Sequence, residues 1–248
     1  MDRSGQVYSD SAKPAGTAAS AESRRYLMLD AMRGLAVSLM IFFHGAFDLN
    51  LFRFIRIDIY KDPFWFSLPR LIVSLFLICV GMSLSLVYTD ACDWRRLWNR
   101  VLVIGGWAAV ISAATFILFP RNFIYFGVLH CIAVSSVAGV FFVNRPKLSL
   151  FLGLGMILSN AIFAPGFFPV SRWLDVVPID HVPFYPYFGM VLIGIYLESI
   201  HLHQVHLKRS APVQMLSVLG RHSLTIYLLH QPILYGAVLV IYKMKKGF

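Results

Sequence analysis

Seven long apolar runs divide the chain, and they restrict what it can fold into. They cover residues 28–49, 68–88, 101–119, 123–143, 148–164, 184–200 and 222–242. A helix that crosses the hydrocarbon core of a bilayer needs about 20 mostly apolar residues. Only 14% of the residues are charged, against about 25% in a soluble domain. The sequence therefore predicts an all-α, polytopic transmembrane helix bundle of about seven spanning helices.

The ends of the chain differ in composition. Residues 1–24 are polar and rich in Ser, Ala and Gly, which predicts a disordered tail, and residues 25–248 form one transmembrane domain. Asp30 and Arg33 interrupt the start of the first run, so we do not interpret that run as a cleavable signal. Glycines inside the later runs are expected to let helices pack closely; these are Gly81, Gly189 and Gly194.

The net charge of +10 is not evidence for nucleic-acid binding, because the basic residues lie at the ends of the apolar runs, as membrane topology requires. With the N-terminus inside, the inner segments hold ten basic residues and the outer segments nine. We therefore expect an inner N-terminus, with the lipid bilayer and not nucleic acid as the partner. Lys243, Lys245 and Lys246, which follow the last run, oppose this orientation and remain unexplained.

The first run carries four ionisable residues. At 100° per residue, Arg33, His44 and Asp48 fall within about 60° of Asp30 on a helix. Such groups are costly inside a membrane, so this face should turn inward and serve a function. Arg33 can pair with Asp30, and Asp48 can orient His44 as a base. Arg33 and His44 are separated by roughly 16 Å of helix rise, a distance that suits a long substrate. The simpler alternative makes Arg33 an interface anchor and His44 an interhelical hydrogen bond.

Two other runs supply further polar groups. His130 opens the fourth run, and Ser223, Tyr227 and His230 share one face of the seventh, followed by Gln231. At membrane depth these residues are candidates for substrate binding. Each of them could instead make only an interhelical hydrogen bond, worth about 1 kcal/mol.

Two polar segments flank the sixth run. Asp180 begins the proline-rich segment 180–189 and either contributes to the site or only caps a helix. His201, His203 and His206 have a spacing compatible with metal binding. No carboxylate or cysteine completes that set, so we expect no metal.

Five short segments, taken in order, carry a resemblance to a known family. They are Leu29-Asp30-Ala31-Met32-Arg33-Gly34-Leu35-Ala36 followed by His44; Phe76-Leu77-Ile78-Cys79-Val80-Gly81-Met82-Ser83-Leu84; Phe126-Gly127-Val128-Leu129-His130; residues 180–189; and residues 220–232. Together they resemble the bacterial DUF1624 family, which is similar to the catalytic domain of heparan-alpha-glucosaminide N-acetyltransferase. The resemblance covers residues 25–242.

The resemblance implies a membrane acyltransferase of the bacterial inner membrane. Acetyl-CoA would be the donor on the cytoplasmic side, and an amine or hydroxyl of a sugar or envelope glycan would be the acceptor on the other side. His44 would perform acid–base chemistry and Arg33 would bind the donor. The family's eukaryotic enzyme has its catalytic histidine in the loop after the first helix. This chain has none between His44 and His130, which weakens the transfer of the family's substrate, glucosamine at a heparan end, to this chain.

We therefore expect His44, oriented by Asp48, to accept a proton from the acceptor while Arg33 holds the donor. The expected substrate-binding residues are Asp30, His130, Asp180, Tyr227, His230 and Gln231. Two other classes of function remain open. The polar face would also suit a transporter or flippase, and two intramembrane histidines would suit a b-type haem protein.

Overall fold

The computed structural model describes residues 27–59, 61–89, 92–163, 180–205 and 207–246. Over these residues the chain is helical, with no strand. This confirms the predicted all-α class. The expected disordered tail, residues 1–24, lies outside the described residues, as does segment 164–179 between the fifth and sixth predicted runs.

Seven helices correspond to the seven predicted runs. They are α2 (Leu27–Leu51), α3 (Pro63–Tyr88), α4 (Trp94–Leu118), α5 (Val128–Val140), α6 (Pro146–Phe163), α8 (Phe184–Ser199) and α10 (Ser223–Lys246). Five of them, α2, α3, α4, α6 and α10, are long and apolar enough to cross a membrane. The other two are shorter, with 13 residues in α5 and 16 in α8. The chain is therefore an integral multi-pass membrane protein.

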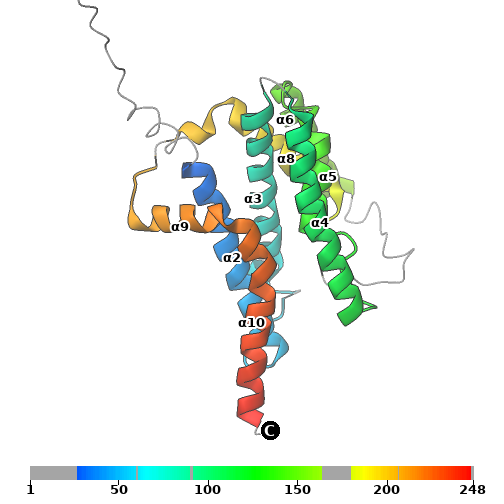
Figure 1. Cartoon of the computed structure of the whole chain (residues 1–248), viewed down its shortest axis with the longest axis vertical. Helices are drawn as coiled ribbons and strands as arrows, with labels where there is room; N and C mark the ends of the chain where they lie inside the picture. The colour runs from blue at the N-terminus through cyan, green and yellow to red at the C-terminus, as the bar shows by residue number, and fades with distance from the viewer. Residues whose placement is uncertain (1–26, 60, 90–91, 164–179, 206, 247–248) are drawn as a thin grey trace, which may run out of the picture.

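Successive helices alternate in direction, so the bundle has two ends (Figure 1). We call the end where α2 begins the N-terminal end and the end where α10 finishes the C-terminal end. The α3–α4, α5–α6 and α8–α9 connections lie toward the N-terminal end. The α2–α3 and α4–α5 connections lie toward the C-terminal end.

Polar and proline residues define where several helices begin. The Asp62 carboxylate accepts hydrogen bonds from the backbone N–H groups at the start of α3, which opens with Pro63. Asp93 caps α4 by accepting from the Arg96 N–H. A carboxylate satisfies N–H groups that have no partner within the helix, and proline lacks the N–H group that would be unsatisfied there.

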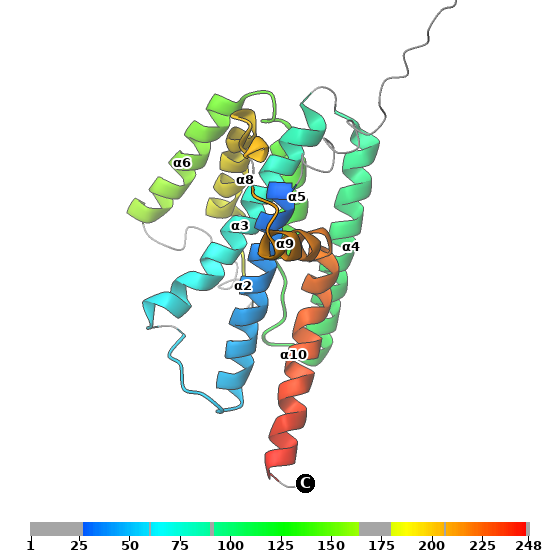
Figure 2. The ribbon, with the colours of Figure 1, turned by 90° about the vertical axis from the view of Figure 1, so that its left-hand side faces the viewer.

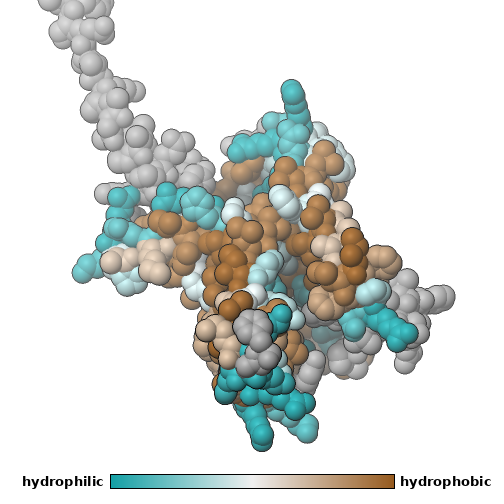
Figure 3. All heavy atoms as spheres, turned by 60° about the horizontal axis from the view of Figure 1, so that its bottom comes forward, coloured by the Kyte–Doolittle hydropathy of each residue, from teal (hydrophilic) through white to brown (hydrophobic). Residues whose placement is uncertain are grey.

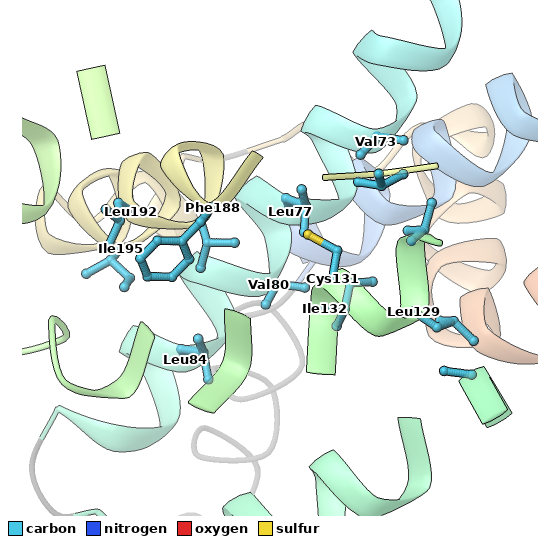
Figure 4. Close-up of a cluster of buried hydrophobic side chains, with 14 of the residues drawn as sticks. Val73, Leu77, Val80, Leu84, Leu129, Cys131, Ile132, Phe188, Leu192 and Ile195 are labelled. Atoms are coloured by element: carbon cyan, nitrogen blue, oxygen red, sulfur yellow. The ribbon is translucent and has the colours of Figure 1, made fainter. Parts of the chain in front are cut away.

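The core lies where α3, α5 and α8 meet (Figure 4). Leu77 from α3, Cys131 from α5 and Ile195 from α8 are almost completely buried in it. A Cβ atom added at Gly81 would lie 2.0 Å from the Val191 carbonyl oxygen, and one at Gly194 would lie 2.2 Å from that of Ile78. The α3 and α8 backbones therefore touch only because these residues are glycines.

The predicted close packing extends to the third glycine. A Cβ atom at Gly189 would lie 2.8 Å from the Gly153 carbonyl oxygen, which brings α8 against α6. The expectation that Gly81, Gly189 and Gly194 permit close helix packing is confirmed.

The outer faces of the bundle are apolar. Large side chains on α4 and α6 point away from the protein; Ile117 is 76% exposed and Phe163 80%. In Figure 3 hydrophobic residues cover the sides, whereas hydrophilic residues gather at the end that carries the C-terminus. This pattern fits sides that contact lipid and an end that contacts water.

The segment between α8 and α10 differs from the predicted loop. It contains a 3-10 turn, η1 (Leu202–Gln204), and an α-helix, α9 (Ala211–Arg221). Figures 1 and 2 show α9 lying across the bundle axis, whereas α10 runs along it. The polar residues of this segment concealed a short helix, because its apolar residues are too few to register as a spanning run.

Two glycines let α9 rest on α2. A Cβ atom at Gly34 would lie 1.9 Å from the Leu216 carbonyl oxygen, and one at Gly220 would lie 1.8 Å from that of Asp30. The first turns of α2 and the end of α9 are therefore in backbone contact. This contact places the α9–α10 junction directly against Asp30.

Candidate functional site

The polar face of α2 begins with an anchored arginine. The Arg33 guanidinium contacts the Asp30 carboxylate at 3.3 Å, as the sequence predicted. Its second terminal nitrogen donates to Ser83 Oγ on α3, and that hydroxyl donates its own proton to the Cys79 carbonyl. Ser83 therefore presents only lone pairs to Arg33. Nothing in the α3 sequence distinguishes Ser83 from its neighbours, and it was not predicted.

Further arginines surround this anchor. Arg96 and Arg100 on α4 lie within electrostatic reach of one another, and Arg100 is also within reach of Arg33. Among the described residues, Asp30 is the one carboxylate that forms an ion pair with any of the three. Among these side chains positive charge therefore exceeds negative charge, and guanidinium groups bind the oxygens of a phosphate well. In the sequence, Arg96 and Arg100 were counted only among the ten basic residues of the inner segments.

His44 lies further along α2, on the same face as Arg33. Its Nδ1 is 3.0 Å from the Met40 carbonyl oxygen. A carbonyl can only accept, so Nδ1 carries the proton and Nε2 holds a lone pair. No described side chain forms a hydrogen bond with Nε2. His44 is thus arranged as a neutral imidazole with a basic nitrogen free to act.

The orienting partner of His44 differs from the one expected. The Met40 carbonyl, one turn earlier on the same helix, takes the Nδ1 proton. The Asp48 carboxylate bonds to Gln231 instead. Side chains on a helix lean toward its N-terminus, so the ring of His44 meets the preceding turn and not the following one.

A second histidine stands beside the first. The ring of His230 on α10 lies 4.8 Å from that of His44, edge to face. Its Nδ1 is 2.7 Å from the Tyr227 carbonyl oxygen, which again leaves Nε2 with the lone pair. That atom is buried and has no hydrogen-bond partner. The two imidazoles therefore have the same tautomer, and each presents a basic Nε2.

Next to these histidines, α2 and α10 are joined by a polar contact between Asp48, one turn beyond His44, and Gln231, which directly follows His230. The Gln231 side-chain N–H donates to Asp48 Oδ1 at 3.0 Å, and Asp48 is fully buried. Asp48 Oδ2 and Gln231 Oε1 are both buried and have no hydrogen-bond partner. Buried polar atoms are nearly always paired, so these oxygens can accept hydrogen bonds from a polar substrate.

His130 is engaged elsewhere. Its Nδ1 accepts from the Gly127 N–H at 3.2 Å, and its Nε2 lies 3.2 Å from Ser112 Oγ. Ser112 in turn donates to the Ile124 carbonyl. Both ring nitrogens are therefore used to fix the start of α5 against α4. This geometry favours the alternative of an interhelical hydrogen bond over substrate binding.

Asp180 also meets the start of α5. Its carboxylate accepts from the Val128 N–H, and burial raises its pKa from 3.8 to about 6. The neighbouring Val182 N–H bonds to the Phe126 carbonyl at 3.1 Å. Asp180 thus caps a helix from a distant part of the sequence, because Gly127 at the N-cap position has no side chain.

Tyr227 links this cap to the histidine pair. Its ring packs on both hydrophobic clusters that border α10 and lies 5.7 Å from that of His230. It is also within electrostatic reach of Asp180. Tyr227 therefore lies near both the Asp180 cap of α5 and the histidine pair.

The predicted site residues thus fall into three groups. His44, Asp48, His230 and Gln231 form one cluster between α2 and α10. Asp30 and Arg33 lie at the N-terminal end, and His130 and Asp180 fix the start of α5. Among the described residues no three potential metal ligands lie together. Of the predicted histidine triplet, His203 is paired with Glu198, and His206 lies outside the described residues.

Comparisons with known proteins find a family that covers most of the chain. A family model described as "Heparan-alpha-glucosaminide N-acetyltransferase, catalytic" matches residues 25–232. The match covers α2 to α9 and the first part of α10, up to residue 232, which carries His230 and Gln231. No curated protein and no solved structure matches the chain significantly.

Proposed function

Because the chain belongs to the family of the heparan-alpha-glucosaminide N-acetyltransferase catalytic domain, we propose that it moves an acetyl group from acetyl-CoA to an amine or hydroxyl of a sugar or envelope glycan. The family implies a membrane acetyltransferase. We further propose that acetyl-CoA is the donor, that the acceptor is a glycan and that the protein lies in the bacterial inner membrane. The observation that carries it is the single face of α2 with Arg33 at one end and His44 further along.

The excess of arginines at the N-terminal end supports a phosphorylated donor. Arg33 is held by Asp30 and Ser83 and is within reach of Arg100. Guanidinium groups bind phosphate oxygens through paired hydrogen bonds. Coenzyme A carries its phosphates at one end and its thioester at the end of a long thin arm. The roughly 16 Å of helix rise between Arg33 and His44 matches such a donor, which would enter from the cytoplasmic side.

His44 provides the base for transfer. As the acceptor nitrogen or oxygen attacks the thioester carbonyl, its proton passes to His44 Nε2. Collapse of the tetrahedral intermediate breaks the carbon–sulfur bond, and the departing thiolate takes a proton back. A positioned base of this kind typically contributes 10²–10⁴-fold.

Other groups of the cluster have supporting parts in this chemistry. His230 presents a lone pair, so it accepts a hydrogen bond from the acceptor and does not donate to the oxyanion. The second N–H of Gln231 and the Tyr227 hydroxyl are the available donors to the developing oxyanion. Asp48, bonded to Gln231, fixes the direction in which that amide points.

Transfer of labelled acetyl groups tests the proposal. Full-length protein in detergent would be incubated with labelled acetyl-CoA and a panel of amino sugars and membrane glycans. His44→Ala would be run beside His222→Ala, which changes an exposed histidine at the start of α10. We expect label to reach an acceptor with the wild type and His222→Ala only.

Two results would overturn it. Full activity of His44→Ala would remove this residue from the mechanism. Passage of a sugar across reconstituted vesicles, without donor binding or transfer, would identify a transporter built on the same polar face.

A further inference from the structure

The loop between α2 and α3 forms a hollow at the C-terminal end of the bundle. Its volume is about 780 Å³. Apolar side chains line most of it, among them Phe47, Leu51 and Ile57, and its polar lining consists of Arg53, Arg56, Asn50 and Asp58. Apolar walls combined with guanidinium groups suit a ligand that has an apolar part and an anionic part.

The two arginines are not neutralised by the loop that carries them. Asp58 pairs with Lys61 at 3.8 Å, and Asp62 is occupied with the first N–H groups of α3. Among the described residues neither Arg53 nor Arg56 forms an ion pair with a carboxylate. The two arginines therefore outnumber the one carboxylate, Asp58, among the residues that line the hollow.

The backbone conformation of Arg53 also indicates that its side chain has a function. Its φ is 61°, the left-handed conformation in which helices commonly end on glycine. A residue with a Cβ atom is disfavoured there by roughly 1–2 kcal/mol. Arginine at this position is worse for stability than glycine, which indicates that its side chain is needed.

The loop is held in shape by α2 itself. Asn50 Oδ1 accepts the Ile57 N–H at 2.8 Å, which ties the far side of the loop to the end of the helix. The Phe54 N–H bonds to the Leu49 carbonyl at 2.8 Å. The hollow is therefore preformed and does not need a ligand to shape it.

The end of α10 adds to the positive charge. Tyr242 packs on Phe52 with ring centroids 5.1 Å apart, and Lys245 Nζ lies 5.4 Å from the centre of the Phe54 ring. This packing brings the basic C-terminal residues beside the loop. Basic residues normally favour the cytoplasmic side of a membrane protein. In the orientation proposed above, these cations lie on the opposite side and need another explanation.

We propose that this hollow binds the phosphate of an amphiphilic acceptor, with the phosphate on Arg53 and Arg56 and the apolar chain against Phe47, Leu51 and Ile57. The acceptor class is then a sugar carried on a lipid phosphate. Phe47, which lines the hollow, follows His44 by less than one helical turn, about 4.5 Å of rise, so the wall of the hollow begins close to the base. This inference rests on the proposed function, whose acceptor it specifies.

Binding of a prenyl phosphate to the full-length protein in detergent tests the proposal without any transfer reaction. The comparison ligands are a prenyl alcohol of the same chain length, inorganic phosphate and phosphatidylglycerol. We expect the prenyl phosphate to bind at least ten-fold more tightly than each of the three. The Arg53→Gly/Arg56→Gln variant should lose at least ten-fold in affinity for it.

Two controls separate binding from folding. Arg121→Gln removes a positive charge from the α4–α5 connection at the same end and should bind as the wild type does. Arg53→Gly alone should unfold at the same or a higher temperature, because glycine tolerates a φ of 61° without strain. A weaker ligand affinity in a stable Arg53→Gly protein then reflects the lost guanidinium group.

Several outcomes would overturn the assignment. One is that the prenyl alcohol binds as tightly as the prenyl phosphate. Another is that phosphatidylglycerol does so, which would make the hollow a bilayer-lipid site. The third is that Arg53→Gly/Arg56→Gln keeps the wild-type affinity for the prenyl phosphate. Failure of the proposed function looks different. In that case acetyl-CoA does not bind at the N-terminal end, and this result is independent of whether prenyl phosphate binds at the C-terminal end.

Discussion

Gln231 donates a hydrogen bond to Asp48 at 3.0 Å, and 183 positions of sequence separate the two residues. Asp48 lies on the first spanning helix and Gln231 on the last. The same two helices bring the rings of His44 and His230 to 4.8 Å. The candidate catalytic cluster is therefore built from opposite ends of the chain.

Replacing Gln231 alone should reduce the stability of the protein more than replacing both Gln231 and Asp48. Gln231→Leu leaves the fully buried Asp48 without a donor, at a cost of roughly 1–3 kcal/mol. Asp48→Leu/Gln231→Leu removes both polar groups and should recover part of that loss. Thermal unfolding in one detergent measures both variants. A double variant that is less stable than Gln231→Leu would contradict this interpretation.

The two interior histidines should respond differently to substitution. His230 has a lone pair open toward His44, so His230→Ala should lower kcat by at least ten-fold with little change in unfolding temperature. His130 has both ring nitrogens bonded. His130→Ala should therefore lower the unfolding temperature, and the remaining folded protein should keep its specific activity. Equal kinetic defects in two equally stable variants would contradict this assignment.

Helical periodicity was sufficient to predict the polar face of α2. The residues that share that face lie on one helix, so their relative directions follow from 100° per residue. The contact between Arg33 and Asp30 has the same origin. The partners from other helices, Ser83 and Arg100, could not be predicted, because they depend on how α3 and α4 are rotated against α2. For the same reason the sequence assigned Asp48 to His44 and missed its bond with Gln231.

Arg33 and Arg100 should determine the affinity for the donor. Arg33→Gln and Arg100→Gln are each expected to raise the KM for acetyl-CoA at least ten-fold, because each removes a guanidinium group that suits a phosphate. Ser83→Ala should raise it less and leave kcat unchanged, since Ser83 positions Arg33 and does not meet the donor. Arg95→Gln changes an exposed arginine at the same end and serves as the control. An equal rise in the KM for acetyl-CoA in Arg95→Gln and Arg100→Gln would contradict a specific role of Arg100 in donor binding.

Two glycines on α2 form a matched pair for testing the contact with α9. A Cβ atom at Gly34 would lie 1.9 Å from the Leu216 carbonyl oxygen, whereas one at Gly45 meets nothing within 4 Å. Gly34→Ala should destabilise the protein by about 1–3 kcal/mol or more. Gly45→Ala should be neutral or stabilising by up to about 1 kcal/mol, since alanine favours helix. The unfolding temperatures of the two variants test the backbone contact between α2 and α9, and equal temperatures would contradict it.

Asp180 should make stability depend on pH. Its pKa rises from 3.8 to about 6 on folding, so the folded protein retains a proton that the unfolded chain releases. The resulting stability is fully present below about pH 4 and is lost as the pH rises through about 6, by at most about 3 kcal/mol. Asp180→Asn does not titrate, and its unfolding temperature should lack this fall. An identical pH profile for the two proteins would exclude Asp180 as the source.

The short helices limited what composition alone could predict. α5 and α8 were detected because their apolar runs are continuous, but their lengths of 13 and 16 residues leave them shorter than a full span. α9 was missed because only part of its circumference is apolar. Its position across α2 depends on Gly34 and Gly220, and the sequence gives no indication that these two glycines face one another.

The long separation between Asp48 and Gln231 also has a consequence for biosynthesis. The first helix enters the membrane while most of the chain is still untranslated, and its buried carboxylate and imidazole have no partner on α10 until the last helix follows. A nascent or truncated chain that ends before residue 223 lacks half of the cluster. In the proposed mechanism, acyl transfer therefore requires the last helix, α10, to be in place.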